Sequence, residues 1–174
     1  RAFDSKEPPI ISTEGNEQYI VYNKAGHTLY AMSEIIGVDR FNRALGKFID
    51  RYRYKHDPYP NIGQFISTLR EETPEDLQYL ITDTFEKITL YENKAKSAKA
   101  IENSDGTYNL HLEVEAKKVY SDSLGVQTTA TLNDWLEIGV IAEKIIDGNK
   151  QEIPIYVQKV LITDSLSTFD IKLE

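Results

Sequence analysis

Histidine and cysteine are the residue types that most often build metal sites and nucleophiles. This chain has three histidines and no cysteine. The histidines are His27, His56 and His111, and no two of them have the i, i+4 spacing that turns two imidazoles toward one zinc ion. The sequence contains no H-E-x-x-H, no Gly-rich phosphate loop and no G-x-S-x-G motif. It therefore predicts no metal site and no cofactor site within this chain.

Residues 51–56 alternate basic and aromatic side chains, a pattern that can stack nucleobases. Within this run, however, Tyr52 continues an apolar helical face, and cations suit the C-terminus of a helix. The net charge of −8 also opposes binding to phosphates. We expect no nucleic-acid partner.

Tyr22 and Lys24 are the remaining pair whose side chains could do chemistry, and they stand at the head of the stretch Tyr19–Tyr54. Two apolar helical patterns meet in this stretch across Gly37, which can end a helix in the left-handed conformation. Asp39 can cap the second helix or stabilise it by charge. The first pattern contains Val21, Ala25, Leu29, Met32 and Ile36, and the second contains Phe41, Leu45, Phe48 and Tyr52. The spacing predicts a helical hairpin that positions the pair.

Further helices are expected after Pro58 and Pro60, which interrupt the pattern. Asn61 with Gln64 three residues later matches a capping box. Thr73-Pro74 matches a helix start, with a hydroxyl cap and proline in the first turn. The first half is thus expected to hold about four helices.

From Phe85 onward the apolar residues recur every 2 residues instead of every 3.6, as in an antiparallel sheet with one solvent-exposed face. Turn-forming clusters separate the alternating runs. With 87–91 and 94–101 counted as two strands, about seven are expected, which suits an immunoglobulin-like β-sandwich. The predicted class is α+β, with a helical part over 1–84 and the sandwich over 85–174.

Hydrophobic content of 40% with 28% charged residues is ordinary for a soluble globular protein. No apolar run approaches the roughly 18 residues that cross a bilayer, and no signal-peptide pattern is present. Because the chain begins at Arg1 rather than Met, we expect it to be a portion of a longer protein.

Several short motifs, taken in order, resemble the region downstream of the zinc site in aminopeptidase N-type (gluzincin) metallopeptidases. The likeness is greatest to the bacterial branch joined to, or encoded with, ABC-type transporter permeases. It covers nearly the whole chain. The matching stretches are 1–9, 18–25, 35–37, 41–45, 52–54, 58–60, Phe65, 85–91 and 136–140.

In that family the tyrosine of a Y-x-K-G motif donates its phenol to the scissile carbonyl oxygen. The resemblance places Tyr22 in that role and Lys24 in the supporting position. This chain departs from the motif because Ala25 replaces the usual glycine and Gly26 follows one residue later, so Tyr19 is the second candidate.

The resemblance also implies that the zinc ligands and the general-base glutamate lie upstream of Arg1. We therefore expect a C-terminal fragment that is inactive alone, with Zn in the parent protein only. Its partners would be the missing N-terminal catalytic lobe and, in the parent, a peptide substrate. The parent would lie on the extracytoplasmic side of a bacterial membrane, and the fragment would be soluble.

Two other interpretations remain open. The chain could be a non-catalytic module, a helical adaptor plus sandwich, that binds a protein or glycan through Tyr52, Tyr54 and Tyr59. It could also come from a degenerate peptidase that has lost its metal. An isolated fragment with uncovered helix surface is further expected to form a homodimer.

Overall fold

The computed structural model describes residues 7–13 and 17–174, and it confirms the α+β class, with helices first and antiparallel strands after them. The chain divides into two compact units. The helical unit contains Arg1–Thr89 and Tyr120–Thr128, and the strand unit contains Leu90–Val119 and Thr129–Glu174. The expected boundary between residues 84 and 85 stays a prediction.

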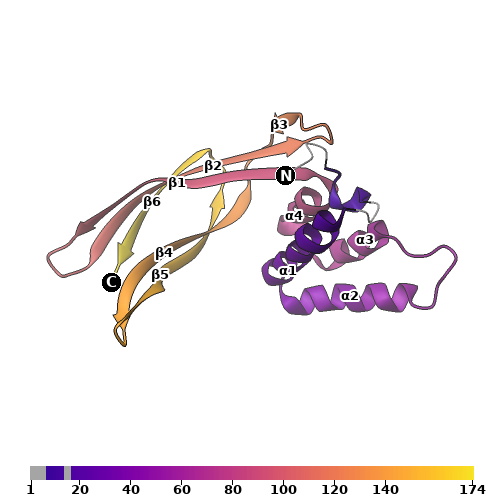
Figure 1. Cartoon of the computed structure of the whole chain (residues 1–174), viewed down its shortest axis with the longest axis horizontal. Helices are drawn as coiled ribbons and strands as arrows, with labels where there is room; N and C mark the ends of the chain where they lie inside the picture. The colour runs from indigo at the N-terminus through magenta and orange to yellow at the C-terminus, as the bar shows by residue number, and fades with distance from the viewer. Residues whose placement is uncertain (1–6, 14–16) are drawn as a thin grey trace. The chain divides into compact units, whose positions relative to one another are not determined.

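The described residues hold four α-helices, with short 3-10 and π-helical turns around them (Figure 1). The α-helices are α1 (Ala25–Ile36), α2 (Val38–Tyr52), α3 (Ile62–Glu72) and α4 (Gln78–Ile81). The turns are η1 (Ile10–Ser12), η2 (Tyr19–Lys24), η3 (Glu75–Leu77) and η4 (Thr82–Glu86).

Gly37 joins α1 to α2 without a linker, as the sequence predicts. Its φ of 94° lies where side chains with a Cβ are strained, and its carbonyl accepts the Phe41 N–H at 3.1 Å to start α2. Of the two roles predicted for Asp39, the cap is not formed, because the cap position is Gly37 and no side chain caps it. Asp39 instead lies in the first turn of α2, where its charge favours the helix dipole.

Asn61 and Gln64 form the predicted capping box at the start of α3. The Asn61 Oδ1 accepts the Gln64 N–H at 3.2 Å, and the Gln64 Oε1 accepts the Asn61 N–H at 2.8 Å. Thr73, in contrast, does not cap the next helix. Its hydroxyl donates to the Leu69 carbonyl at 2.8 Å, and its backbone N–H donates to the same carbonyl at 3.1 Å, so Thr73 closes α3.

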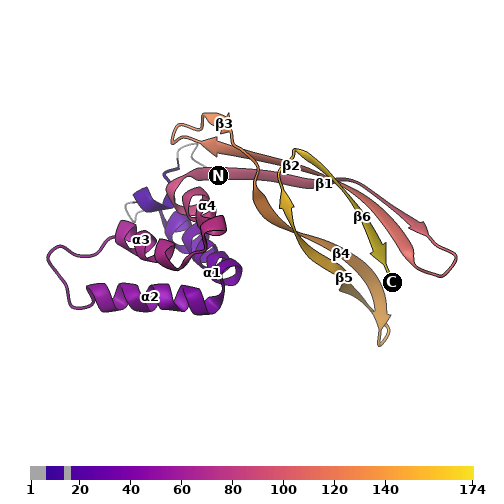
Figure 2. The same ribbon diagram turned by 180° about the vertical axis from the view of Figure 1, so that it is seen from behind.

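Helices α2 and α3 lie side by side in both views of the ribbon (Figures 1 and 2). Phe48 of α2 meets Phe65 of α3 edge-on, with ring centroids 5.5 Å apart. The buried core of the helical unit contains Ile10, Ile20, Met32, Ile36, Ala44, Ile66, Leu69, Leu77, Ile81 and Phe85. No helix in the described residues has the length and hydropathy needed to cross a membrane.

The strand-forming part of the described chain has six strands rather than the expected seven. Residues 87–91 and 94–101 do not form two strands, because strand β1 continues through them without a break. The strands are β1 (Ile88–Glu102), β2 (Tyr108–Ser121), β3 (Gln127–Thr129), β4 (Asp134–Ile146), β5 (Asn149–Ile162) and β6 (Leu166–Leu173). They form a four-stranded sheet, in which β2 lies between β1 on one side and β3 and β6 on the other, and a two-stranded sheet of β4 and β5. A seven-stranded immunoglobulin-like sandwich is therefore not confirmed.

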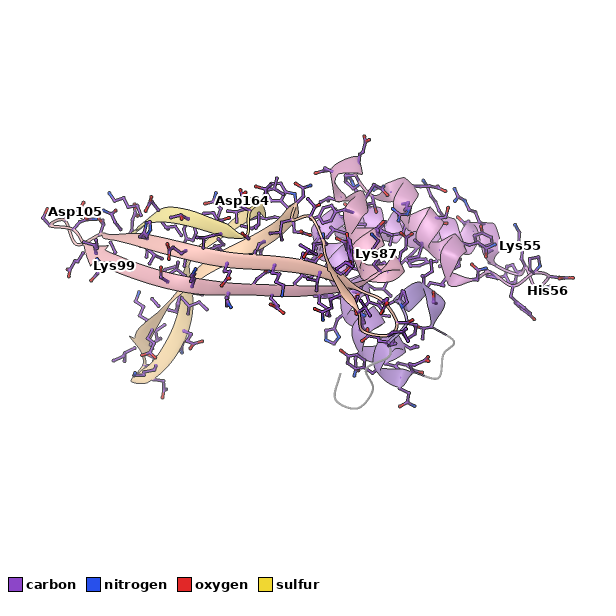
Figure 3. The ribbon with its side chains drawn as sticks, turned by 90° about the horizontal axis from the view of Figure 1, so that it is seen from above. Lys55, His56, Lys87, Lys99, Asp105 and Asp164 are labelled. Carbon is purple, nitrogen blue, oxygen red and sulfur yellow. The ribbon has the colours of Figure 1, made fainter. Side chains whose placement is uncertain are left out.

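The predicted alternation does build the core of the strand unit. In the antiparallel pair of β2 and β6, Leu110 lies opposite Ile171 and Leu112 opposite Phe169. Ile138 of β4 is buried in the same cluster, so the two sheets share one apolar core. The turn predicted between β1 and β2 is present, and Figure 3 labels Asp105 at its tip.

Candidate functional site

Tyr22 lies in η2, the π-helical turn that leads directly into α1. Ile20 of the same turn is only 3% exposed and anchors it in the core, whereas Tyr22 is 75% exposed. Single π-helical turns occur often at functional sites. The local structure thus presents the phenol to solvent from an anchored backbone, as a tyrosine that meets an external substrate requires.

Lys24, the residue expected to support Tyr22, forms an ion pair with Glu7. Both side chains are largely withdrawn from solvent, and the pair ties the segment before η1 to the end of η2. Lys24 therefore positions the backbone that carries Tyr22. Among the described residues, none makes a hydrogen bond to the Tyr22 hydroxyl.

Tyr19, the second candidate, is in the same turn and is also exposed. His27 follows one turn later, where its Nδ1 lies 2.5 Å from the Asn23 carbonyl oxygen. This contact occupies one ring nitrogen with the backbone of the turn itself. The imidazole is therefore fixed locally beside η2.

The three histidines lie on separate elements. His56 is in the loop after α2 (Figure 3), and His111 of β2 pairs with Asp170 of β6, with Nδ1 2.7 Å from Oδ1. Residues 7–13 and 17–174 contain no group of three or more His, Cys, Asp or Glu side chains that could hold a metal ion. The described residues therefore do not supply the three or four ligands that a zinc site needs.

The three tyrosines of the recognition hypothesis have different environments. Tyr52 packs on Phe48, with ring centroids 5.0 Å apart, and the Lys55 Nζ lies 5.5 Å from the centre of the Tyr52 ring. Tyr54 and Tyr59 are exposed, Tyr54 at 89%. In the same run, Arg51 donates from both terminal nitrogens to Glu71, at 2.6 and 2.7 Å, so its charge is already compensated.

A pocket of about 540 Å³ lies within the helical unit and was not predicted from the sequence. Lys87 and Tyr120 line it, and the Lys87 Nζ lies 3.8 Å from the centre of the Tyr120 ring. The Tyr120 hydroxyl donates to Asp83 at 2.8 Å, and Asp83 is 3% exposed. No spacing rule could reveal this group, because Lys87 and Tyr120 are 33 positions apart in the chain.

A buried ion pair in the strand unit was missed as well. Lys118 of β2 donates to both carboxylate oxygens of Asp134, at 2.9 and 3.2 Å. The signal was available, since Lys118 continues the inward phase of Leu110, Leu112, Val114 and Ala116.

Comparisons with protein-family models, curated proteins and solved structures gave no match to this chain.

Proposed function

We propose that this chain is the C-terminal portion of a larger zinc aminopeptidase-like protein, in which Tyr22 stabilises the oxyanion of the tetrahedral intermediate. The observation that carries the proposal is the exposed phenol of Tyr22 on a turn anchored by Ile20 and by the Lys24–Glu7 pair. The order of the sequence motifs supports the same assignment.

The physical reason is that negative charge accumulates on the carbonyl oxygen only as the intermediate forms. A donor held in place before the reaction therefore stabilises the transition state more than the bound substrate. A rigid helical turn limits the reorganisation that the phenol must undergo.

In this proposal the helices wall one side of the active-site cleft, and the zinc ligands and general base belong to the missing N-terminal lobe. The zinc would supply the activated water in the parent protein. The strand unit would be an immunoglobulin-like structural or docking module on the extracytoplasmic side of a bacterial membrane. The homodimer of the isolated chain stays a prediction.

The first experiment is to sequence the parent reading frame upstream of Arg1 for H-E-x-x-H followed by a glutamate. Tyr22→Phe in the full protein should then lower kcat by roughly 100- to 1000-fold, the usual loss for one oxyanion donor. Steady-state kinetics on an amino-acid anilide would measure it.

Tyr30→Phe is the matched control, because Tyr30 is also an exposed tyrosine and lies on the adjacent helix α1. It should leave kcat unchanged. An intact zinc motif with full activity in the Tyr22→Phe variant would remove Tyr22 from the mechanism and leave Tyr19→Phe to be tested. Absence of the zinc motif would contradict the peptidase proposal and favour a scaffold or interaction domain.

The second candidate is a protein- or glycan-binding module, favoured by the exposure of Tyr54 and Tyr59. Exposed aromatic side chains are typical of interfaces. Under this alternative, Tyr54→Ala with Tyr59→Ala would abolish capture of the partner, and Tyr22→Phe would have no effect.

A further inference from the structure

The pocket lined by Lys87 and Tyr120 has a fixed cation at its wall. Lys87 immediately precedes β1 (Figure 3), and its ammonium group rests on the face of the Tyr120 ring at 3.8 Å. The ring is held in turn by the hydrogen bond from its hydroxyl to buried Asp83. A cation–π contact leaves the ammonium N–H groups able to donate elsewhere.

In the described part of the chain, Lys87 forms no ion pair. Two carboxylates also line the pocket, and both have other partners. Glu86 pairs with Arg70 at 2.7 Å and accepts the Thr82 hydroxyl at 3.0 Å. Asp122 accepts two backbone N–H groups of its own turn at 2.9 Å each. Neither carboxylate of the lining therefore forms an ion pair with Lys87.

The rest of the lining combines apolar and hydroxyl groups. Pro9 and Val126 supply apolar surface, while Ser121, Ser123 and Thr128 supply hydroxyls. A volume of about 540 Å³ lies within the range of small-molecule sites. We propose that this pocket binds a carboxylate joined to a small apolar group, with the carboxylate on Lys87 and the apolar group against Pro9 and Val126.

This site is separate from the Tyr22 assignment, and neither depends on the other. The ligand chemistry has two sources, a free organic acid or the C-terminus of a peptide with an apolar last residue. Both present the same carboxylate and the same apolar group.

Isothermal titration of the full chain would use three probes: N-acetyl-leucine, N-acetyl-leucinamide and N-acetyl-Ala-Ala-Leu. We expect at least one of the two acids to bind and the amide to bind much more weakly. Lys87→Gln should weaken the acid by roughly 10- to 100-fold, the range for a hydrogen bond to a charged group. Lys87→Arg should restore most of the affinity because it keeps the cation.

Lys99→Gln is the control, since Lys99 is an exposed lysine of β1 outside the pocket lining (Figure 3). Circular dichroism would show that each variant is folded. Binding of both acids supports the proposal and shows that a free organic acid is a sufficient ligand. Binding of N-acetyl-Ala-Ala-Leu alone supports the proposal and indicates that the ligand is the C-terminus of a peptide. Equal binding of amide and acid, unchanged affinity in Lys87→Gln, or no binding by any probe would overturn it.

Discussion

Lys118 and Asp134 form an ion pair in the strand unit that is largely withdrawn from solvent. Lys118 is 4% exposed, and Asp134 also accepts the Tyr91 hydroxyl at 3.2 Å. Removing two charges from water costs several kcal/mol per ion, which their mutual attraction and hydrogen bonds must offset. Loss of the Asp134 charge removes the carboxylate that accepts from the buried Lys118 ammonium group at 2.9 and 3.2 Å.

We therefore expect Asp134→Asn to lower the free energy of unfolding by about 3–5 kcal/mol, the usual cost of breaking a buried pair from one side. Equilibrium urea unfolding followed by the fluorescence of Trp135, the neighbouring residue, would measure the change. The control is Glu143→Gln in the exposed pair with Lys150 of the same hairpin. It should change stability by less than about 1 kcal/mol, and equal effects in the two variants would contradict the argument.

At the scale of elements, the junction of α1 and α2 depends on a glycine conformation. Gly37 has φ 94° and ψ 133°, a combination that residues with a Cβ rarely adopt. Gly46 lies inside α2, and a Cβ built there would meet no heavy atom within 4 Å. A methyl group added at Gly37 would therefore strain the backbone, whereas one added at Gly46 would be accommodated without a clash.

Gly37→Ala should destabilise the chain by about 1–3 kcal/mol through backbone strain. Gly46→Ala should stabilise it by about 0.5–1 kcal/mol, because alanine loses less conformational freedom in a helix. Thermal unfolding followed by circular dichroism at 222 nm measures both. A stabilising Gly37→Ala would show that the junction does not require the positive φ.

Helices α2 and α3 are further joined by charges on their facing surfaces. Arg51 pairs with Glu71, while Arg43 and Lys47 pair with Glu72 at 2.9 and 2.5 Å. The hydrogen bond from Arg51 lowers the pKa of Glu71 below its ordinary value of 4.5, and the hydrogen bonds from Lys47 and Arg43 do the same for Glu72. Both carboxylates are therefore more acidic in the folded chain.

A lowered folded-state pKa means that the stabilisation is present above pH 4.5 and is lost as the pH falls through the lower folded value. We expect the melting temperature of the chain to fall as the pH is lowered from about 6 to about 3. The double variant Glu71→Gln, Glu72→Gln should show a smaller fall, measured by circular dichroism across this range. An identical pH dependence in the two proteins would exclude these carboxylates as its source.

At the scale of the whole molecule, the proposed function places the oxyanion donor in this chain and the zinc ion in the missing lobe of the parent protein. Under this proposal the zinc ligands belong to the missing N-terminal lobe, so we expect that the chain alone does not hydrolyse an amino-acid anilide even with added zinc. A chromogenic assay at micromolar chain, with and without Zn²⁺, tests this expectation. Zinc-dependent hydrolysis that Tyr22→Phe abolishes would show that the chain builds a complete site by itself.

Local sequence signals were sufficient for much of the fold. The capping box of Asn61 and Gln64 depends on residues three positions apart, and the Gly37 junction on one residue, so both are determined within a few residues of the chain. The period-2 run of β2 likewise fixed which side chains face the core. The number of strands was wrong because no local signal shows whether β1 bends or continues through residues 92–93.

The sequence by itself determined the α+β order, the helical hairpin and the position of Tyr22 at its head. Only the tertiary structure decided that the Tyr22 side chain is exposed while Ile20 is buried, and that Lys24 is paired with Glu7. It also decided that Lys87 rests on Tyr120 and that Lys118 meets Asp134. These pairings join residues 16 to 33 positions apart, and chain spacing does not encode which distant side chains meet when apolar surfaces pack.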